Sequence, residues 1–444
     1  MKSDPADILL ALDQRVEGII DACSACGACV SVCPTPGINA MAAPDPQQIT
    51  AGVLDILRNG PGPENAVQWA EGCCGSGFCL NVCEHGINPR FMLNMARRAL
   101  RKGDPIDRRK QSGKDDFKGM SRGVRLISRL QMSPELLNRL NPSSHPDRPA
   151  PPDLIFYTGC NMLKTPHIGL LCLDVLDRLS VSYEVHGGPA NCCGILQLRS
   201  GDDENSVRQG AKTIERFTAT GTTEILSWCP TCQIQFGETL MPGYAADGSA
   251  PFDVTMFPVY LANRMSDLKP LMTTRVEKRV ALNEYPGAIG VTEAVTGLLS
   301  AIPGLEVVEL KLPRAGYQMT SLTNRDYAEK HLADLLRAGE AAGVTTFASV
   351  FHGDHREFVS HEPHWPFEIV NYMDLIGESM GFHRPDTFKK LKLMQDVDAM
   401  MAEAKAEIVS NRLDPEEVRD VILKQILGDQ LLQAAPDTHP RRGS

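Results

Sequence analysis

The sequence predicts a multidomain chain that combines α+β and α/β regions: a helical, cysteine-rich N-terminal domain, two α/β repeats and a helical tail. Three observations predict this class. Eight of the 14 cysteines lie within the first 100 residues. Two segments about 126 residues apart share a strand–helix–strand pattern, which is typical of mostly parallel sheets. The sequence after residue 386 is charged and has helical periodicity.

These observations divide the chain into five regions. We expect an N-terminal domain over 1–102, a connector with one amphipathic helix over 103–152, a first repeat over 153–270, a second repeat over 271–386, and a helical tail with a disordered end over 387–444. Within the N-terminal domain, helices are predicted at 50–59 and from Pro89 onward.

The two repeats are predicted from matching segments. In the first, a strand runs into Cys160 and is followed by a helix at 167–179 and a strand at 181–185. In the second, the corresponding segments are 280–287, 291–302 and 305–312. Later segments also match: 225–236 corresponds to 347–358, and helix-like sequence follows at 257–265 and 369–381. Strand–helix–strand alternation places ligands near the carboxyl ends of the strands.

Charge and composition narrow the range of functions. The 444 residues include 45 Lys and Arg against 55 Asp and Glu, a net charge of −10, which argues against a nucleic-acid partner. No apolar run is long enough to span a bilayer and no export signal opens the sequence, so we expect a cytoplasmic protein. Peripheral association with the inner face of the membrane, through a partner, stays open. Clustered cysteines in a reducing compartment favour metal ligation over disulfides.

The first cysteine motif is CSACGACVSVCP, which contains Cys23, Cys26, Cys29 and Cys33. Its C-x2-C-x2-C-x3-C-P spacing is that of bacterial ferredoxins, in which three cysteines bind one [4Fe–4S] cluster and the fourth binds a second cluster. A zinc knuckle would instead need two pairs of cysteines. The spacing therefore predicts a ferredoxin-like domain that transfers electrons.

The second motif, WAEGCCGSGFCLNVCEHGINP, departs from this spacing because Ser76 occupies the second ligand position. With crossed ligation, cluster 1 would use Cys23, Cys26, Cys29 and Cys83. Cluster 2 would use Cys33 and Cys79 together with one or both of Cys73 and Cys74. We favour a second [4Fe–4S] cluster with Cys74 as the substitute ligand. A three-iron cluster, ligation by the Ser76 oxygen, and Cys73 and Cys74 as simple buried thiols remain alternatives.

A third group of cysteines has a different spacing. Cys160 is followed after 31 residues by Cys192-Cys193-Gly194, and after 34 more by Cys229-Pro230-Thr231-Cys232. Five thiolates exceed what one tetrahedral zinc ion needs, and Gly194 gives the backbone freedom to turn both adjacent sulfurs inward. The pattern favours an unusual iron–sulfur assembly, with zinc held by four of the five as the alternative.

This order of motifs resembles the iron–sulfur subunits of the heterodisulfide reductase family, of the D type in which C and B modules are fused. The resemblance covers residues from about 15 to about 385 and includes the cysteine-rich "CCG" domain. Iron–sulfur subunits of glycolate oxidase and anaerobic glycerol-3-phosphate dehydrogenase share this plan. The resemblance implies that one noncubane-type [4Fe–4S] cluster, at which a disulfide is cleaved or formed, is held by Cys160, Cys192, Cys193, Cys229 and Cys232.

The second repeat departs from the family pattern, because no cysteine follows Cys232. Pro286 lies near the position of Cys160, Tyr317-Gln318-Met319 replaces Cys-Cys-Gly, and Phe351 and Asp354 replace the last pair. A second thiolate-bound cluster is therefore excluded. This half contains His352, His355, His361 and His364, which would bind another metal or transfer protons; the alternative is that they are polar loop residues of a decayed repeat.

We therefore expect an oxidoreductase subunit that passes electrons through two N-terminal cubanes to or from the CCG cluster, where a thiol or disulfide substrate binds. Cys193, His352 and His355 are the predicted catalytic residues. Because no dinucleotide fingerprint is present, the electron donor or acceptor is expected to be a flavoprotein or another redox subunit, with a quinone-reactive membrane partner as an option. The alternatives are a pure electron-transfer subunit of a flavin-dependent, glycolate oxidase-type complex, and a zinc-containing scaffold.

Overall fold

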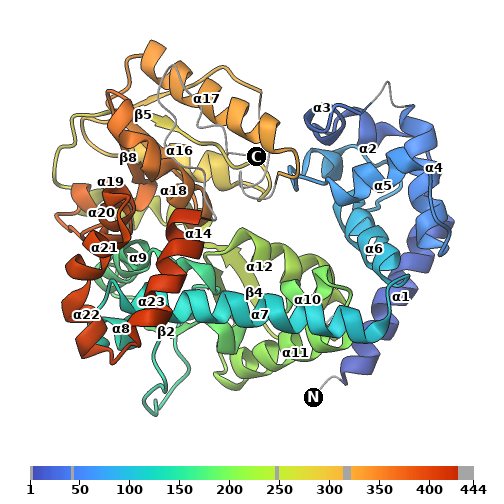
Figure 1. Cartoon of the computed structure of the whole chain (residues 1–444), viewed down its shortest axis with the longest axis horizontal. Helices are drawn as coiled ribbons and strands as arrows, with labels where there is room; N and C mark the ends of the chain where they lie inside the picture. The colour runs from blue at the N-terminus through green and yellow to red at the C-terminus, as the bar shows by residue number, and fades with distance from the viewer. Residues whose placement is uncertain (1–3, 42–44, 246–249, 314–321, 429–444) are drawn as a thin grey trace.

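The computed structural model describes residues 4–41, 45–245, 250–313 and 322–428 (Figure 1). The N-terminal region is helical, as predicted. Its elements are α1 (Pro5–Ala22), α2 (Ala28–Ser31), α3 (Thr35–Ile38), α4 (Pro46–Leu57), α5 (Glu64–Glu71), η1 (Phe78–Asn81) and α6 (Pro89–Arg101).

Three of these helices begin with the same local arrangement. The side chains of Asp4, Asp45 and Asn88 each accept a backbone N–H of the first turn, and a proline follows each of them. A polar N-cap followed by proline is a strong helix start, because proline lacks the N–H that would be unpaired there. The helix predicted from Pro89 is confirmed, and the one predicted at 50–59 begins earlier, at Pro46.

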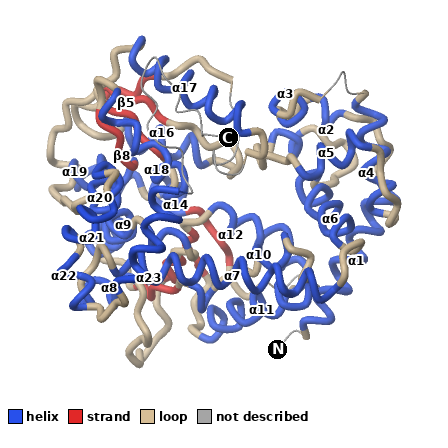
Figure 2. Tube along the Cα trace, in the orientation of Figure 1, coloured by secondary structure: helices blue, strands red, loops and turns tan. Residues whose placement is uncertain are grey.

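The remainder contains two parallel sheets, seen as separate groups of strands in Figure 2. Both have four strands in the same order, β2-β1-β3-β4 and β6-β5-β7-β8. The shared order is what a duplication predicts. The first sheet comprises β1 (Leu154–Tyr157), β2 (Tyr183–His186), β3 (Glu224–Ser227) and β4 (Asp253–Met256). The second comprises β5 (Arg279–Leu282), β6 (Glu306–Val308), β7 (Thr346–Ser349) and β8 (Glu368–Asn371).

Four of these strands were not assigned by the sequence prediction: β3 and β7, which overlap the matching segments 225–236 and 347–358, and β4 and β8. Strand β4 lies directly before the helix-like segment that begins at residue 257, and β8 occupies the first residues of the segment predicted as helical at 369–381. Both strands lie at an edge of their sheet and have only four residues. So short an edge strand has no extended hydrophobic alternation from which it could be recognised.

Helices connect the strands of both repeats. In the first they are η2 (Asn161–Lys164), α9 (Pro166–Arg178), η3 (Pro189–Asn191), α10 (Ile195–Arg199), α11 (Asp203–Ala219), α12 (Pro230–Ile234), η4 (Gln235–Leu240), α13 (Met241–Tyr244), α14 (Phe257–Asn263), α15 (Met265–Leu268) and η5 (Lys269–Leu271). In the second they are α16 (Val291–Ser300), α17 (Arg325–Ala341), α18 (His352–Phe358), η7 (Val359–His364) and α19 (Tyr372–Ser379).

The connector and the tail pack against each other. The connector contains α7 (Ile106–Arg129), much longer than the amphipathic helix expected there, and α8 (Pro134–Leu140). The tail contains α20 (Thr387–Met394), α21 (Val397–Glu403), α22 (Lys405–Ser410), α23 (Pro415–Val421) and η8 (Ile422–Gly428). In Figure 1, α7 extends from the N-terminal region past the first repeat to these last helices.

Contacts between these helices show that the tail is a packed element and not a free arm. Leu126 and Ile127 of α7 share a buried hydrophobic cluster with Val418 and Ile422. The Arg125 guanidinium lies 2.7 Å from the Glu417 carboxylate. The expected disordered end falls at 429–444, outside the described residues. None of the helices that the structure describes is both long and apolar enough to cross a membrane.

Candidate iron–sulfur site

Strand order brings the predicted CCG cysteines together. Tyr157 at the end of β1 pairs with Ser227 at the end of β3, so the loops that follow both strands begin side by side. Loops at the carboxyl ends of neighbouring parallel strands form the usual ligand site of such sheets. These loops and the turn after η3 carry five cysteines, each at most 8% exposed: Cys160, Cys192, Cys193, Cys229 and Cys232.

Two glycines allow these loops to approach each other. Gly159 has φ +66°, and a Cβ there would lie 2.8 Å from the Cβ of Cys229. Gly194 has φ +82°, and a Cβ there would overlap the carbonyl oxygen of Ser206 on α11. The backbone N–H of Gly194 also lies 3.5 Å from the Cys192 sulfur. A side chain at either position would therefore displace a cysteine loop.

We expect Gly194→Ala to destabilise the first repeat and to reduce iron retention at the CCG cysteines. The left-handed backbone alone costs a non-glycine residue about 1–2 kcal/mol, and the overlap with Ser206 adds to this. Gly343→Ala is the matched control, because Gly343 also has positive φ but no atom lies within 4 Å of where its Cβ would be. Thermal unfolding and iron analysis of both variants would test the prediction. Equal losses of stability and of iron in Gly194→Ala and Gly343→Ala would contradict it.

The thiols form a connected network. Hydrogen bonds from Cys160 and Cys193 hold the pKa of the Cys192 thiol well below its ordinary value. The same bonds to Cys192 raise the pKa of Cys160 and of Cys193. The Tyr157 hydroxyl is a hydrogen-bond donor to the Cys232 sulfur, at a distance of 3.5 Å. Because metal ligation requires thiolates, binding a metal group here must release the protons of the other thiols.

In the N-terminal region, the first three cysteines of CSACGACVSVCP lie close together. Cys23 and Cys26 are near enough to Cys29 to contribute to raising the pKa of its thiol to about 11, an effect dominated by burial. Ser24 and His85 are 2.8 Å apart and hold the loop of Cys83 against this motif. Cys26 is exposed, and Cys23 and Cys83 are half-buried. The predicted cluster 1 site is thus near the surface.

The predicted cluster 2 residues lie deeper. Burial, together with Cys73 and Cys33, raises the pKa of Cys79, and the Trp69 indole N–H lies 3.4 Å from the Cys33 sulfur. Cys74 is 1% exposed. Its sulfur receives two donors, the Thr35 hydroxyl at 3.5 Å and the backbone N–H of Ser76. The structure therefore brings Cys33, Cys73, Cys74 and Cys79 together, with Cys74 and Cys79 buried and Cys33 and Cys73 half-buried.

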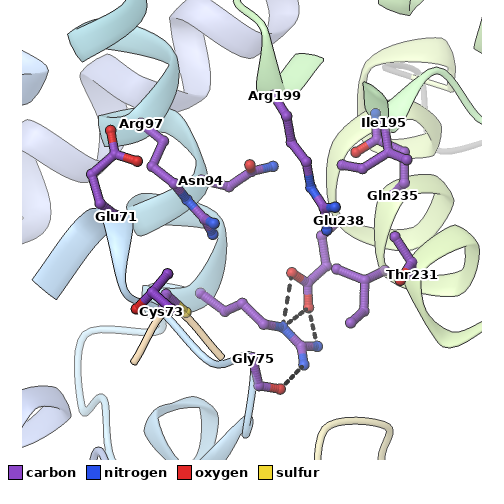
Figure 3. A pocket seen from close by; sticks show the side chains of 13 residues that line it. Glu71, Cys73, Gly75, Asn94, Arg97, Ile195, Arg199, Thr231, Gln235 and Glu238 are labelled. Atoms are coloured by element: carbon purple, nitrogen blue, oxygen red, sulfur yellow. Dashed lines mark hydrogen bonds and ion pairs between the residues drawn. The ribbon is translucent and has the colours of Figure 1, made fainter. Parts of the chain in front are cut away.

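A cavity of about 290 Å³ lies between this group and the CCG loops (Figure 3). From the N-terminal region, Cys73 and Arg97 line it; from the first repeat, Arg199 of α10 and Thr231, between Cys229 and Cys232, line it. Cys73 thus lines the cavity directly, whereas the CCG loops reach it through Ile195 and Thr231 and none of their cysteines is among its lining residues. Its remaining lining residues are Glu71, Gly75, Arg90, Asn94, Ile195, Ile234, Gln235, Glu238 and Thr323.

Several charged residues of this site were missed by the sequence prediction. Arg90, which lines the cavity, forms an ion pair with Glu238 at 2.5 Å and donates to the carbonyl of Gly287 at 2.6 Å. Arg356 of the second repeat donates to the carbonyl of Asn161, next to Cys160. Burial lowers the pKa of Arg356 to about 10, and the nearby Cys229 acts in the opposite direction. A sequence pattern gives no signal for such contacts, whose partners lie far apart in the chain.

The predicted catalytic histidines lie behind the cysteine loops and do not line this cavity. The Trp228 indole N–H donates to His352 Nδ1 at 3.2 Å, and burial holds the pKa of His352 well below its ordinary value. His355 lies 3.2 Å from Ser349 Oγ and 2.7 Å from Asp386. His352 therefore accepts a hydrogen bond as a neutral imidazole, while His355 belongs to a separate polar group.

Aromatic side chains fill the region of the second repeat that corresponds to the CCG loops. Phe351, which replaces Cys229, packs edge-on against Tyr285 and Trp228, with ring centroids 4.7 and 5.8 Å away. These rings occupy the position that corresponds to Cys229 of the first repeat. The predicted replacement of Cys-Cys-Gly by Tyr317-Gln318-Met319 lies outside the described residues.

Comparisons with known families agree with this arrangement. A model of the 4Fe-4S dicluster domain matches residues 22–88, and a model of the cysteine-rich CCG domain matches residues 154–237. The fold and these matches define an iron–sulfur protein that joins a dicluster domain to a CCG domain. No solved structure matches the chain significantly.

The chain is homologous to the D subunit of heterodisulfide reductase, which is part of an oxidoreductase. It is 24% identical over 340 residues to the D subunit of the dihydromethanophenazine:CoB--CoM heterodisulfide reductase of Methanosarcina acetivorans, covering 66% of this chain and 75% of that protein. The Methanosarcina mazei protein of the same name is 24% identical over 334 residues, with the same coverage. The B subunit of a fumarate reductase (CoM/CoB) from Methanothermobacter marburgensis is 28% identical over 163 residues, covering 35% of this chain and 30% of that protein. The predicted resemblance is confirmed.

Proposed function

We propose that this chain is a redox subunit that moves electrons between a partner protein and a thiol or disulfide substrate at its CCG cysteines. One observation carries the proposal: a single cavity is bordered by Cys73 of the predicted cluster 2 and by the CCG loops. When bound, iron–sulfur clusters would supply one-electron chemistry and an iron site for a substrate sulfur. Cluster 1 would be held by Cys23, Cys26, Cys29 and Cys83, cluster 2 by Cys33, Cys73, Cys74 and Cys79, and a noncubane-type cluster by the five CCG cysteines.

The burial of the cysteines supports an order for these sites. The exposed Cys26 supports docking of a flavoprotein or another redox subunit at cluster 1. Cys74 and Cys79 are 1% and 6% exposed, which supports a position of cluster 2 inside the protein, next to the cavity. This difference in burial supports a short chain of redox sites that leads from the surface to the substrate. A quinone-reactive membrane partner would then act through the docked subunit.

The chain's own residues give the cavity its selectivity. Arg97 and Arg199 line it, and the Nε of Arg97 has no hydrogen-bond partner among the described residues. Arg90 is already paired with Glu238. The side-chain amide of Gln235 is buried in the cavity wall with both polar atoms unpaired among the described residues. These donors would hold a polar, anionic part of a substrate, and its sulfur would have to pass Thr231 to reach the CCG cysteines, which do not line the cavity.

We further propose that the chain consists of the five regions 1–102, 103–152, 153–270, 271–386 and 387–444, with α7 in the second region.

A pure electron-transfer role in a flavin-dependent, glycolate oxidase-type complex is the second candidate function. One observation favours it: the second repeat has no cysteine and its equivalent site is filled by Phe351, Tyr285 and Trp228.

The test is anaerobic iron and sulfide analysis with EPR of the same sample before and after addition of a thiol. We expect iron for three clusters and a thiol-sensitive EPR signal that is lost in Cys193→Ala. Cys172→Ala is the matched control, because Cys172 is also completely buried but lies in α9, outside the cysteine loops. Iron for only two clusters, with one zinc per chain that is lost in Cys193→Ala, would contradict the cluster assignment. Iron for three clusters without a thiol response would favour the electron-transfer role.

A further inference from the structure

We propose a second kind of metal site, for one divalent transition-metal ion, in a histidine–aspartate cluster between the two repeats. The cluster consists of His167, His355 and Asp386, whose ligand atoms all lie within 4.8 Å of one another. Two imidazoles and one carboxylate are a ligand set for Zn²⁺ or Fe²⁺, whereas Ca²⁺ and Mg²⁺ prefer oxygen alone. The site is distinct from the cysteine sites and does not depend on the proposed function.

His167 is the residue that points to a ligand. It lies near the start of α9 in the first repeat and is 3% exposed. Neither of its ring nitrogens makes a hydrogen bond to a described residue. Its Nδ1 lies 3.5 Å from Asp386 Oδ1, which is long for a hydrogen bond but close to the separation of two ligands of one ion, about 3.4 Å at bonds of about 2.1 Å.

Each of the two rings directs one nitrogen toward Asp386 and the other away from it. A metal-bound histidine normally directs its other ring nitrogen at a carboxylate, a backbone carbonyl or water, which fixes the ring. The Nε2 of His167 faces the Asp374 carboxylate, with Asp374 Oδ2 3.8 Å away, beyond hydrogen-bond distance. The Nδ1 of His355 lies 3.2 Å from Ser349 Oγ. Both rings are thus oriented with the remaining nitrogen toward Asp386.

Asp386 is placed to bind between the two rings. Its Oδ1 faces His167, and its Oδ2 is 2.7 Å from His355 Nε2. The carboxylate also accepts the N–H of Lys389 as the N-cap of α20, which fixes its position. An ion would lengthen the His355–Asp386 contact by about 0.7 Å, to the spacing of two ligands on one ion. Asp374 and Asp386 also line a cavity of about 590 Å³, so the carboxylate end of the cluster borders an open space.

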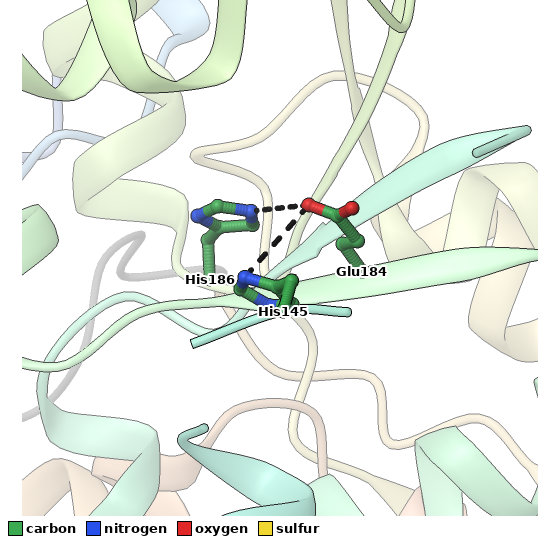
Figure 4. Close-up of side chains that lie close together, drawn as sticks. All are labelled: His145, Glu184 and His186. Atoms are coloured by element: carbon green, nitrogen blue, oxygen red, sulfur yellow. Dashed lines mark hydrogen bonds and ion pairs between the residues drawn. The ribbon is translucent and has the colours of Figure 1, made fainter. Parts of the chain in front are cut away.

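The other three-ligand group is a useful contrast (Figure 4). His145, Glu184 and His186 are half-buried on the edge strand β2 and its neighbouring loop. Every member already has a partner: His186 lies 3.1 Å from Glu184, and the Nε2 of His145 lies 2.9 Å from the carbonyl of Val185. Arg148 lies 3.8 Å from the second oxygen of Glu184. This group is explained without a metal.

The experiment is to add one equivalent of Zn²⁺ to the anaerobically purified full chain, desalt it, and measure bound zinc and its X-ray absorption. We expect one zinc per chain with only nitrogen and oxygen ligands. His167→Gln and Asp386→Asn should lose this zinc while keeping their iron, and His145→Gln should retain it. Ser349→Ala should weaken zinc binding by about 10–100-fold, as expected for an outer contact of a ligand.

Three outcomes would overturn the proposal. Wild-type protein that retains no zinc has no such site. Zinc with sulfur ligands would place the ion at the cysteines. Zinc retained equally by His167→Gln and Asp386→Asn would exclude these ligands. The iron content of each variant reports separately on the cysteine clusters, so failure of this site leaves the proposed redox function untouched.

Discussion

Replacing Cys74 with alanine is expected to convert the second N-terminal cluster into a three-iron cluster, with a loss of about one iron per chain. The reason is the environment of its sulfur. Cys74 is 1% exposed, and both the Thr35 hydroxyl and the backbone N–H of Ser76 are directed at the sulfur, as donors are at a cluster thiolate. Iron analysis and the EPR signal of an oxidised three-iron cluster would measure the change.

Two further variants make this result specific. Ser76→Cys restores the regular C-x2-C-x2-C-x3-C spacing, so adding it to Cys74→Ala should recover the lost iron. Cys172→Ala, at an equally buried cysteine of α9, should leave the iron content unchanged. If Cys74→Ala retains all iron while Ser76→Ala loses it, the serine oxygen is the ligand and our assignment is wrong.

The sequence alone was sufficient for the parts of the fold and site that depend on local spacing. The cysteine runs identify their clusters because ligands two or three residues apart must share one loop. The duplication was recognisable because strands β1 and β5 are continuous apolar runs, buried in the centre of their sheets. The helix from Pro89 was predictable because proline fits the first turn of a helix; its cap, Asn88, was identified only in the structure.

What the sequence could not predict depends on contacts between distant segments. Arg90 forms hydrogen bonds with Glu238 and with the carbonyl of Gly287, which are 148 and 197 residues away in the sequence. Neither contact produces a recognisable local sequence pattern. His167 lies in a helix whose other residues are mostly apolar, so no sequence pattern singles it out. The carboxylates near it, Asp374 and Asp386, belong to the other repeat. The tail was ambiguous because its apolar face is explained only by α7, which lies some 290 residues earlier in the chain.

Replacing Arg90 with methionine is expected to destabilise the junction between the N-terminal region and both repeats by about 3–5 kcal/mol. The pair with Glu238 is 9% and 15% exposed, so removal of the guanidinium leaves a carboxylate uncompensated and mostly buried. It also leaves the Gly287 carbonyl without its 2.6 Å donor. Arg101→Met is the matched control, because its pair with Glu71 is 40% and 33% exposed and should contribute at most about 1 kcal/mol. Urea midpoints followed by cluster absorbance would compare the two.

Arg90→Met should also lower the reduction potential of the second N-terminal cluster. The positive charge of Arg90 acts on Cys73 and Cys79, and its loss disfavours the more negative, reduced cluster. The double variant Arg90→Met with Glu238→Met separates charge from packing: it removes both charges at once, so the potential and much of the stability should return toward wild type. Redox titration by EPR measures the first effect and urea midpoints the second. If the double variant is as destabilised as Arg90→Met, the packing of the arginine stem, and not the buried charge pair, joins the N-terminal clusters to the CCG site.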